Sequence, residues 1–392
     1  MYPLFRCFSE AILARYPNSS LLLATTYSIL DSILLLLRRP SSARLKQVKT
    51  KSILVVNLAH IGDILYSQIL VDVLKRAFPE SSIGFLCGSW CHSVLELHNS
   101  IDAIYCLDHY RLNRRSISLF LKIIVYLRGI LRIVKQLRDA KYNSVIVLNP
   151  KPNILPILCL CSIPTRIGYT SAGLGSLLTD PYSYPINNWH ITQYHINLLR
   201  SLGVSDSSYS LQPLSTLYSR PDVVETLLTL YPQLSEGFFI LHVGTGEVKR
   251  EWPVPKWREL IRLINQRSKM LVFTGLGPRE EHIVATLFDS RRKHLNLCGK
   301  LNWLELNSII SIADHVICVE SVVSHLCAIH NVPASSVWSG LNRQHYFKPL
   351  NKSVVTLTAD LDCLGCFRGC YDMSCLTLVE PVDVFQSLPL MS

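Results

Sequence analysis

Asp63 is the acidic residue best placed for acid–base chemistry, because it follows a buried hydrophobic run in the segment His60-Ile61-Gly62-Asp63. Gly62 lets the backbone turn sharply, which puts the carboxylate in the first turn of a helix predicted from Ile64 to about Phe78. Two interpretations fit this position about equally. The carboxylate could cap the helix, or it could act as a general base on an acceptor hydroxyl, with His60 and Gly62 among the acceptor contacts.

A second candidate site is a glycine-rich segment in the second half of the chain. Small residues let backbone amides approach a phosphate closely, and lysine or arginine neutralises its charge. Glycine in such a turn often has only a steric role, but two following cations favour a diphosphate site. Its members are Gly244, Thr245, Gly246, Lys249 and Arg250.

A third candidate site follows the hydrophobic run that ends at Val319. An acid and hydroxyl groups at a strand-to-helix junction suit the ribose of a nucleotide, or a diphosphate at the helix N-terminus. The same residues could simply cap the helix, and its histidine could equally be a buried core residue. The candidates are Glu320, Ser321, Ser324 and His325.

A basic stretch from 111 to 141 contains nine lysines and arginines and one acid, Asp139. One interpretation is a solvated helix face. The other is a docking surface for an anionic acceptor, such as a phosphorylated lipid-linked saccharide, or for the membrane itself. Arg111, Arg114 and Arg115 are the predicted acceptor contacts.

Four cysteines near the C-terminus, Cys363, Cys366, Cys370 and Cys375, have a spacing found in zinc and iron–sulfur sites. Reduced thiols or a disulfide are the favoured alternative, so no metal is assigned. The other nine of the thirteen cysteines are scattered singly through the chain, as is typical of buried thiols in a reducing cytoplasm.

Two series of buried strands and amphipathic helices must position these groups. Continuous β-branched runs such as Ser52 to Leu58 and Phe238 to Val243 are typical of parallel strands buried on both faces. Further strands are predicted at 83–87, 101–107, 144–148, 270–274, 295–297, 315–319 and 334–338. The sequence therefore predicts an α/β protein with two Rossmann-like domains facing a central cleft, where ligands bind at the carboxyl ends of the strands.

A polar, turn-rich stretch from Ser201 to Pro232 marks the predicted joint between the domains. Residues 51–215 are assigned to an acceptor domain, and residues 216–392 to a donor domain with a cysteine-rich tail. Residues 1–50 form an extra N-terminal helical segment that is predicted to associate with the membrane.

The apolar run from 20 to 37 begins too late for a signal peptide. It would barely cross a bilayer, and Asp31 would then lie inside the hydrocarbon. Six basic residues between Arg38 and Lys51 favour a helix that lies on an anionic inner leaflet. A true span and a helix packed on the protein's own core are the alternatives.

The 392-residue chain is 49% hydrophobic and 17% charged, which excludes a disordered protein, and its length suits two domains. The formal net charge of +11 indicates an acidic partner. No nucleic-acid-binding signature accompanies the cations, so a phosphate-bearing sugar or lipid is favoured over nucleic acid.

Taken in order, these motifs resemble glycosyltransferase family nine, the heptosyltransferases of lipopolysaccharide assembly. The resemblance covers about residues 52 to 385. The matching segments are 60–63 (HIGD), 166–169 (RIGY), the glycine-rich segment with Arg250 and Trp252-Pro253, Thr274-Gly275, 296–300 (NLCGK) and Ser324-His325.

The resemblance implies a GT-B fold and an inverting, metal-independent and cofactor-free transfer of a heptose-like sugar. The implied donor is a nucleotide sugar such as ADP-heptose, and the implied acceptor is lipopolysaccharide or a related saccharide. Asp63 matches the family's catalytic aspartate, and Arg250 stands where the family usually has a phosphate-contacting lysine. Glu320-Ser321-Val322 departs from the family's Asp-Ser/Thr-Gly, and the valine adds bulk where the donor diphosphate would approach.

The expected enzyme lies in the cytoplasm, peripheral on the inner face of the cytoplasmic membrane. Two other classes stay open: a catalytically degenerate relative that binds a nucleotide or partner, and a GT-B nucleotide-sugar epimerase. Release of free nucleotide only when acceptor is added would separate a transferase from both.

Overall fold

The computed structural model describes residues 21–37, 51–113, 117–149, 154–171, 173–184, 188–204, 220–366 and 370–389. The chain divides into two compact units. Unit 1 comprises Met1–Asn187 and Thr192–Ser210, and unit 2 comprises Asn188–Ile191 and Leu211–Ser392. The predicted boundary at 215 falls among residues 205–219, which lie outside the described ranges, and it stays a prediction.

Unit 1 is built on a six-stranded parallel sheet with the order β3-β2-β1-β4-β5-β6. The central strand β1 is fully buried from Ile53 to Val56, as its apolar run predicts for a strand covered on both faces. The strands are β1 (Ser52–Val56), β2 (Ser82–Cys87), β3 (Ala103–Cys106), β4 (Ser144–Val147), β5 (Thr165–Tyr169) and β6 (Asp180–Tyr182).

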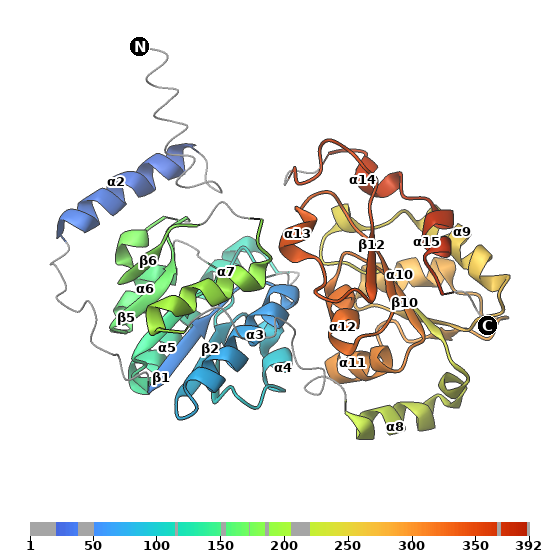
Figure 1. Ribbon diagram of the computed structural model, residues 1–392, viewed down its shortest axis with the longest axis horizontal. Helices are drawn as coiled ribbons and strands as arrows, with labels where there is room; N and C mark the ends of the chain where they lie inside the picture. The colour runs from blue at the N-terminus through green and yellow to red at the C-terminus, as the bar shows by residue number, and fades with distance from the viewer. Residues whose placement is uncertain are drawn as a thin grey trace, which may run out of the picture. The chain divides into compact units, whose positions relative to one another are not determined.

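The helices of unit 1 pack on this sheet in two groups (Figure 1). Helix α3 contacts α4, whereas α5 contacts α6 and α6 contacts the short helix η2. Their bounds are α3 (Ile61–Ala77), η1 (Ser89–Cys91), α4 (His92–Leu95), α5 (Leu119–Ala140), α6 (Ile154–Leu160), η2 (Gly175–Leu177), α7 (Ile191–Asn197) and η3 (Leu198–Leu202).

The N-terminal helix α2 (Leu21–Leu37) contacts η2, so one of its faces packs against the rest of unit 1. Asp31 is buried and accepts hydrogen bonds from the amide (2.9 Å) and the hydroxyl (2.6 Å) of Ser176. This contact agrees with the alternative of a helix packed on the protein itself. Among the described helices, none has the length and apolar character to cross a membrane. The basic segment from Arg38 to residue 50 lies outside the described residues.

Unit 2 repeats the same topology, with a six-stranded parallel sheet in the order β12-β11-β10-β7-β8-β9. Counted from its own first strand, this is again the Rossmann order 3-2-1-4-5-6. The strands are β7 (Phe239–His242), β8 (Leu271–Thr274), β9 (Leu295–Asn296), β10 (His315–Val319), β11 (Ala334–Val337) and β12 (Val354–Leu357). Two Rossmann-like units with an extra N-terminal helix confirm the predicted fold class.

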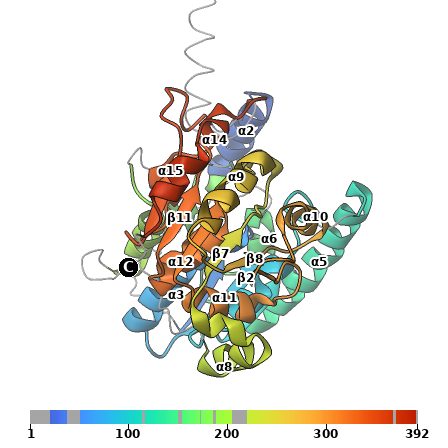
Figure 2. The ribbon, with the colours of Figure 1, turned by 90° about the vertical axis from the view of Figure 1, so that its right-hand side faces the viewer.

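The helices of unit 2 surround its sheet, with α15 packed along α9 and α8 packed along α11 (Figures 1 and 2). Their bounds are α8 (Pro221–Leu230), η6 (Pro232–Glu236), η7 (Val248–Arg250), α9 (Val254–Asn265), α10 (Pro278–Leu287), α11 (Trp303–Ser311), α12 (Val322–His330), α13 (Gln344–Phe347), α14 (Ser374–Thr377) and α15 (Pro381–Gln386).

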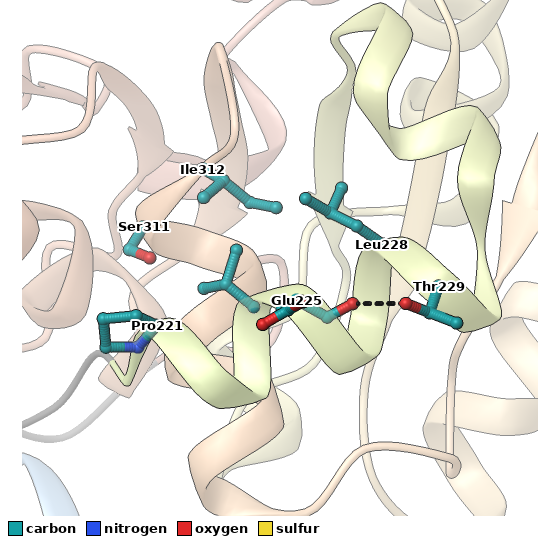
Figure 3. A pocket seen from close by; sticks show the side chains of 7 residues that line it. Pro221, Glu225, Leu228, Thr229, Ser311 and Ile312 are labelled. Atoms are coloured by element: carbon teal, nitrogen blue, oxygen red, sulfur yellow. Dashed lines mark hydrogen bonds between the residues drawn. The ribbon is translucent and has the colours of Figure 1, made fainter.

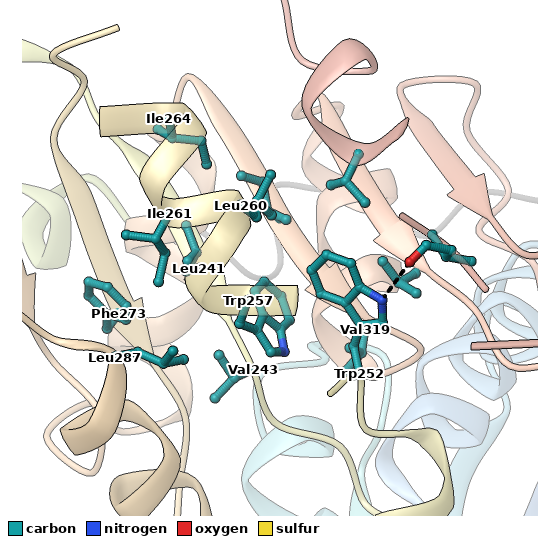
Figure 4. Packing of buried hydrophobic residues seen from close by; sticks show 14 of the residues in the cluster. Leu241, Val243, Trp252, Trp257, Leu260, Ile261, Ile264, Phe273, Leu287 and Val319 are labelled. Atoms are coloured by element: carbon teal, nitrogen blue, oxygen red, sulfur yellow. Dashed lines mark hydrogen bonds between the residues drawn. The ribbon is translucent and has the colours of Figure 1, made fainter. Parts of the chain in front are cut away.

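The core of unit 2 is centred on Trp252 and Trp257, whose rings meet edge to face with centroids 5.1 Å apart (Figure 4). Trp252 Nε1 donates a hydrogen bond to the carbonyl of Val379 (3.2 Å), which joins the start of α9 to the C-terminal segment. Trp252, one of the residues of the family resemblance, is thus a buried core residue. It fixes the chain directly after Arg250.

Three strands were absent from the sequence-based prediction: β5, β6 and β12. Each is short and lies at or next to a sheet edge, and β5 and β6 contain glycine or proline in place of a continuous apolar run. Edge strands are buried on fewer sides, so their sequences need no such run.

Candidate active site

Asp63 lies at the third position of α3, directly beyond the carboxyl end of β1. The amide of His60, the N-cap residue, donates a hydrogen bond to Asp63 Oδ2 (3.3 Å), which is part of a capping box. The charge of Asp63 also contributes, after burial, to the raised pKa of the Tyr66 phenol. The carboxylate therefore caps the helix, and because it is partly exposed it could also reach a proton donor.

The turn before α3 is fixed by contacts that the sequence did not predict. Trp90 Nε1 (3.0 Å) and the Cys91 thiol (3.8 Å) both donate to the carbonyl of Ala59. The buried Asn57 accepts from the Ala59 amide (3.0 Å), and the Trp90 ring lies 6.3 Å from the His60 ring, centroid to centroid. These contacts hold the backbone of the turn that positions His60 and Asp63.

Arg111 is the described member of the three arginines predicted to contact an acceptor. It is exposed and follows β3, so it lies at the carboxyl edge of the same sheet that places Asp63. Its guanidinium lies 5.6 Å from the centroid of the Tyr110 ring, a cation–π distance. Arg114 and Arg115 lie outside the described residues.

The strand order of the sheet in unit 2 reverses between β7 and β10, and doubly wound sheets bind ligands at such a point. The segments that follow these two strands touch each other there. Thr245 Oγ1 donates to the carbonyl of Glu320 (3.1 Å), 75 residues further along the chain. The glycine-rich segment and the acidic segment, which carry the predicted donor-binding residues, therefore lie together.

Arg250 and Glu320 form the ion pair at the centre of this arrangement, with Arg250 Nη1 3.1 Å from Glu320 Oε1. Glu320 is only 5% exposed, and its carboxylate also accepts from the hydroxyl of Ser339 and from Asn342 Nδ2 (3.2 Å). Arg250 remains 28% exposed, with Glu247 3.5 Å from its Nε. The buried carboxylate therefore holds a guanidinium that still reaches solvent.

Ser321 is the N-cap residue of α12, but its side chain makes no capping hydrogen bond. In the described part of the chain, the buried Ser321 Oγ has no hydrogen-bond partner, while Ser324 Oγ donates to the Ser321 carbonyl (2.8 Å). A helix N-terminus carries a partial positive charge and unpaired amides. This end of α12, with Val322 as its first residue, can therefore accept an anion.

His325 is buried in α12 against the Trp338 ring, 6.2 Å away between centroids. Burial, with a further contribution from the nearby His190, lowers the pKa of His325 to about 3. The ring is neutral at physiological pH. It therefore offers no positive charge to a phosphate.

A Cβ atom at Gly244 would lie 2.0 Å from Oε2 of Glu280, so an added side chain would displace this carboxylate. Glu280 Oε2 in turn accepts from the amide of Leu276 (2.7 Å). Arg279 Nη2 donates to the carbonyl of Thr245 (2.8 Å) from the other side. The loop after β8 thus fixes the loop after β7, whose outer residues Gly246 and Lys249 are exposed.

Four residues that contact the predicted site were missed from sequence: Arg279, Glu280, Ser339 and Asn342. Arg279 and Glu280 follow β8, and Ser339 and Asn342 follow β11. The carboxyl ends of four neighbouring strands therefore build one site. The polar residues after each predicted strand were the available signal.

The C-terminal cysteines do not form a recognisable metal centre in the described ranges. Cys363, Cys366 and Cys370 are exposed, and Cys375 is buried. No group of three or more histidine, cysteine, aspartate or glutamate residues is arranged to hold a metal ion among the residues that the structure describes.

Described residues of unit 2 line a groove and a second cavity, each of about 490 Å³. The first is a groove between α8 and the end of α11, where Leu228 and Ile312 face each other (Figure 3). Ile312 precedes β10 whereas Glu320 follows it, so this groove lies at the opposite edge of the sheet from the candidate site. The second adjoins the site, and its lining includes Asn342 together with Arg343 and Gln344.

Comparison with known families gives one match that spans most of the chain. The family described as Glycosyltransferase family 9 (heptosyltransferase) matches residues 130–376. A curated relative, Lipopolysaccharide heptosyltransferase 3 of Escherichia coli (strain K12), is 22% identical over 308 residues, which are 76% of this chain and 85% of the relative.

Solved structures share the fold. A family 9 glycosyltransferase from Veillonella parvula superposes with a TM-score of 0.70 at 17% identity, covering 87% of this chain and 97% of the other. An E. coli heptosyltransferase with ADP-2-deoxy-2-fluoro heptose superposes with a TM-score of 0.62 at 17% identity, covering 86% and 98%.

Proposed function

The chain belongs to glycosyltransferase family 9, and from this premise we propose that it transfers a heptose-like sugar from an ADP-activated donor to lipopolysaccharide or a related cell-surface saccharide. The names of its relatives support this choice of donor and acceptor. The observation in this chain that carries the proposal is the Arg250–Glu320 pair beside the uncapped N-terminus of α12.

The donor diphosphate would lie at the N-terminus of α12, where its charge meets the helix amides and the hydroxyl of Ser321. Arg250 would supply a fixed positive charge and a planar set of donors for the phosphate oxygens. Glu320 would act by holding Arg250, since its carboxylate is already occupied by protein donors. The remaining proposed donor contacts are Gly244, Thr245, Gly246, Lys249, Ser324 and His325.

Asp63 would be the general base of the transfer. It would take the proton from the acceptor hydroxyl as that oxygen forms a bond to the anomeric carbon of the donor. The bond between the anomeric carbon and the diphosphate oxygen breaks, and ADP leaves with the electron pair on the opposite face, which inverts the configuration. Arg250 and the α12 amides would stabilise the negative charge that develops on the leaving ADP.

The acceptor would be an anionic, lipid-linked saccharide that binds near His60, Gly62 and Arg111, with Arg114 and Arg115 as further proposed contacts. The net charge of +11 favours such an acceptor. The scattered single cysteines favour a cytoplasmic enzyme, and the basic segment after the apolar N-terminal run favours the inner face of the membrane. Nucleic acid is not a proposed partner.

Donor binding is tested by thermal shift of the purified protein with ADP and ADP-heptose, with UDP as the matched control. We expect stabilisation by the two adenine compounds, and its loss in Arg250→Ala. Stabilisation that persists unchanged in Arg250→Ala would remove this residue from the donor site.

Catalysis is tested by Asp63→Asn in an assay of ADP release with and without acceptor. The amide keeps the size of the side chain but cannot take up the proton, so we expect acceptor-dependent release to fall by about 10²–10⁴-fold. The ADP-induced thermal shift should be unchanged. Turnover within about tenfold of wild type would exclude Asp63 as the base.

A second candidate function, a relative that binds a nucleotide or partner without catalysis, is favoured by Val322. Its side chain stands at the first position of α12, where an approaching diphosphate would meet it. Val322→Gly separates the two candidates. If ADP-heptose produces a thermal shift only in this variant, the wild-type chain is a degenerate family member.

A further inference from the structure

Helix α5 exposes an apolar stripe that a helix facing only water would lack. Phe120, Leu127 and Leu131 lie on one face at helical spacing, and Phe120 is 71% and Leu131 75% exposed. The opposite face of the helix packs into the core of unit 1 through Tyr126, Gly129, Ile133 and Leu137. The exposed stripe is therefore not a consequence of a loosely packed helix.

Cations border the C-terminal half of this stripe. Arg128, Arg132 and Lys135 follow the apolar positions around the helix, and Asp139 is the single acid between Leu119 and Ala140. Arg132 donates to the carbonyl of Cys106 (3.1 Å). Within the described ranges, no carboxylate forms an ion pair with Arg128 or Lys135, so their charges are available to an external anion.

A second apolar surface lies in the same layer of unit 1. Helices α5, α6, η2 and α2 contact one another in turn, which makes α2 a continuation of this layer. On α2, Ile29, Leu30 and Ile33 are exposed on the side away from the buried Asp31. The protein covers one face of α2 and leaves an apolar face outward.

We propose that this layer of unit 1, with α5 as its main element, docks on the surface of an anionic lipid bilayer. An apolar stripe beside a row of cations is the pattern of a helix that lies in the headgroup region, with its apolar side chains among the acyl chains. No described helix is long and apolar enough to span the membrane, which agrees with surface binding.

A second copy of the chain fits this surface less well than an anionic bilayer. A symmetric dimer would place the same face of both copies together, and the cations that border each stripe would then repel each other. An anionic bilayer satisfies both kinds of side chain at once. Docking would also bring the enzyme to the lipid-linked acceptor of the proposed function. This purpose rests on the proposed function, whereas the docking itself does not.

The test is co-flotation of the full-length protein with vesicles of phosphatidylcholine alone or with about one third phosphatidylglycerol, at low and high salt. We expect binding to the anionic vesicles, reduced at high salt. Phe120→Ser with Leu131→Ser should weaken this binding at least tenfold. Arg128→Glu with Lys135→Glu should abolish the preference for phosphatidylglycerol.

Matched controls come from unit 2. Leu230→Ser removes a leucine that is 62% exposed, and Lys293→Glu with Lys352→Glu reverses two exposed lysines. Both controls should bind vesicles like wild type. All variants should keep the wild-type melting temperature and ADP-induced thermal shift, so that failure of the docking proposal is distinguishable from failure of the donor site.

Three results would overturn the proposal. One is equal vesicle binding by wild type and both α5 variants. Another is wild-type binding that is the same with and without phosphatidylglycerol. The third is a dimer in light scattering that Phe120→Ser with Leu131→Ser dissociates while vesicle binding is unaffected, because the stripe would then be a contact between copies.

Discussion

Glu320→Gln is the substitution that most directly tests how the candidate donor site is built. The amide keeps the shape of the side chain but removes the charge opposite Arg250. It also replaces one acceptor oxygen by an NH₂ donor. The three groups now bound to the carboxylate, from Arg250, Ser339 and Asn342, are all donors, so the new amide nitrogen would face a donor.

The expected loss of stability follows from these contacts. A hydrogen bond to a charged group contributes about 1.5–3 kcal/mol, and a buried polar group without a partner costs about 1–3 kcal/mol. Because Arg250 is 28% exposed, water replaces part of what it loses. The net destabilisation should therefore be about 2–4 kcal/mol, which corresponds to a fall in Tm of roughly 5–10 °C.

The matched control is Glu247→Gln, which alters the other carboxylate near the same guanidinium. Glu247 is 49% exposed and lies 3.5 Å from Arg250 Nε, so this pair should contribute at most about 1 kcal/mol. Differential scanning calorimetry gives Tm for both variants, and titration with ADP gives Kd. We expect Kd to rise about tenfold in Glu320→Gln, equivalent to about 1.4 kcal/mol, and to change little in Glu247→Gln.

A double-mutant cycle with Arg250→Ala isolates the pair. If Glu320 acts by holding Arg250, Glu320→Gln should have little further effect on ADP affinity once Arg250 is absent. Equal effects of Glu320→Gln and Glu247→Gln on Tm would refute the argument from burial. Additive effects on Kd in the cycle would refute the positioning role.

Two further predictions concern the same unit. Gly244→Ala should lower stability by about 1–3 kcal/mol because its Cβ displaces the Glu280 carboxylate. In a double-mutant cycle measured by calorimetry, Glu280→Ala should suppress most of that loss. An equal loss in both backgrounds would contradict the steric explanation. Acidification should destabilise unit 2, because burial lowers the pKa of several of its histidines. The pKa falls to about 3 for His325 and to about 4 for His190, His242, His315 and His330. In the unfolded chain the pKa of a histidine is about 6.5, so below this pH only the unfolded state takes up protons. The stabilisation from these histidines is therefore complete above pH 6.5 and is lost toward pH 4. The loss is up to about 1.4 kcal/mol per pH unit for each histidine. A Tm from circular dichroism that is constant between pH 7.5 and 5 would contradict this.

Much of the fold could be predicted from the sequence because buried parallel strands need continuous apolar runs. β1 and β10 are such runs, and their positions fixed where Asp63 and Glu320 would emerge from the sheets. The order of the motifs along the chain then matched that of glycosyltransferase family nine. The start of α3 was misplaced by three residues, because His60, and not a residue nearer Ile64, is the N-cap. Helix ends depend on local hydrogen bonds, which composition does not reveal.

The sequence by itself determined two Rossmann-like units, the family and the residues at the strand ends. Only the tertiary structure decided what those residues do to one another. Glu320, proposed as a ligand contact, is occupied by Arg250, Ser339 and Asn342 from other strands. Asp31 is paired with Ser176 and not immersed in lipid. Burial and pairing depend on which distant segments meet, and a linear pattern specifies each segment's own preferences but not its partners.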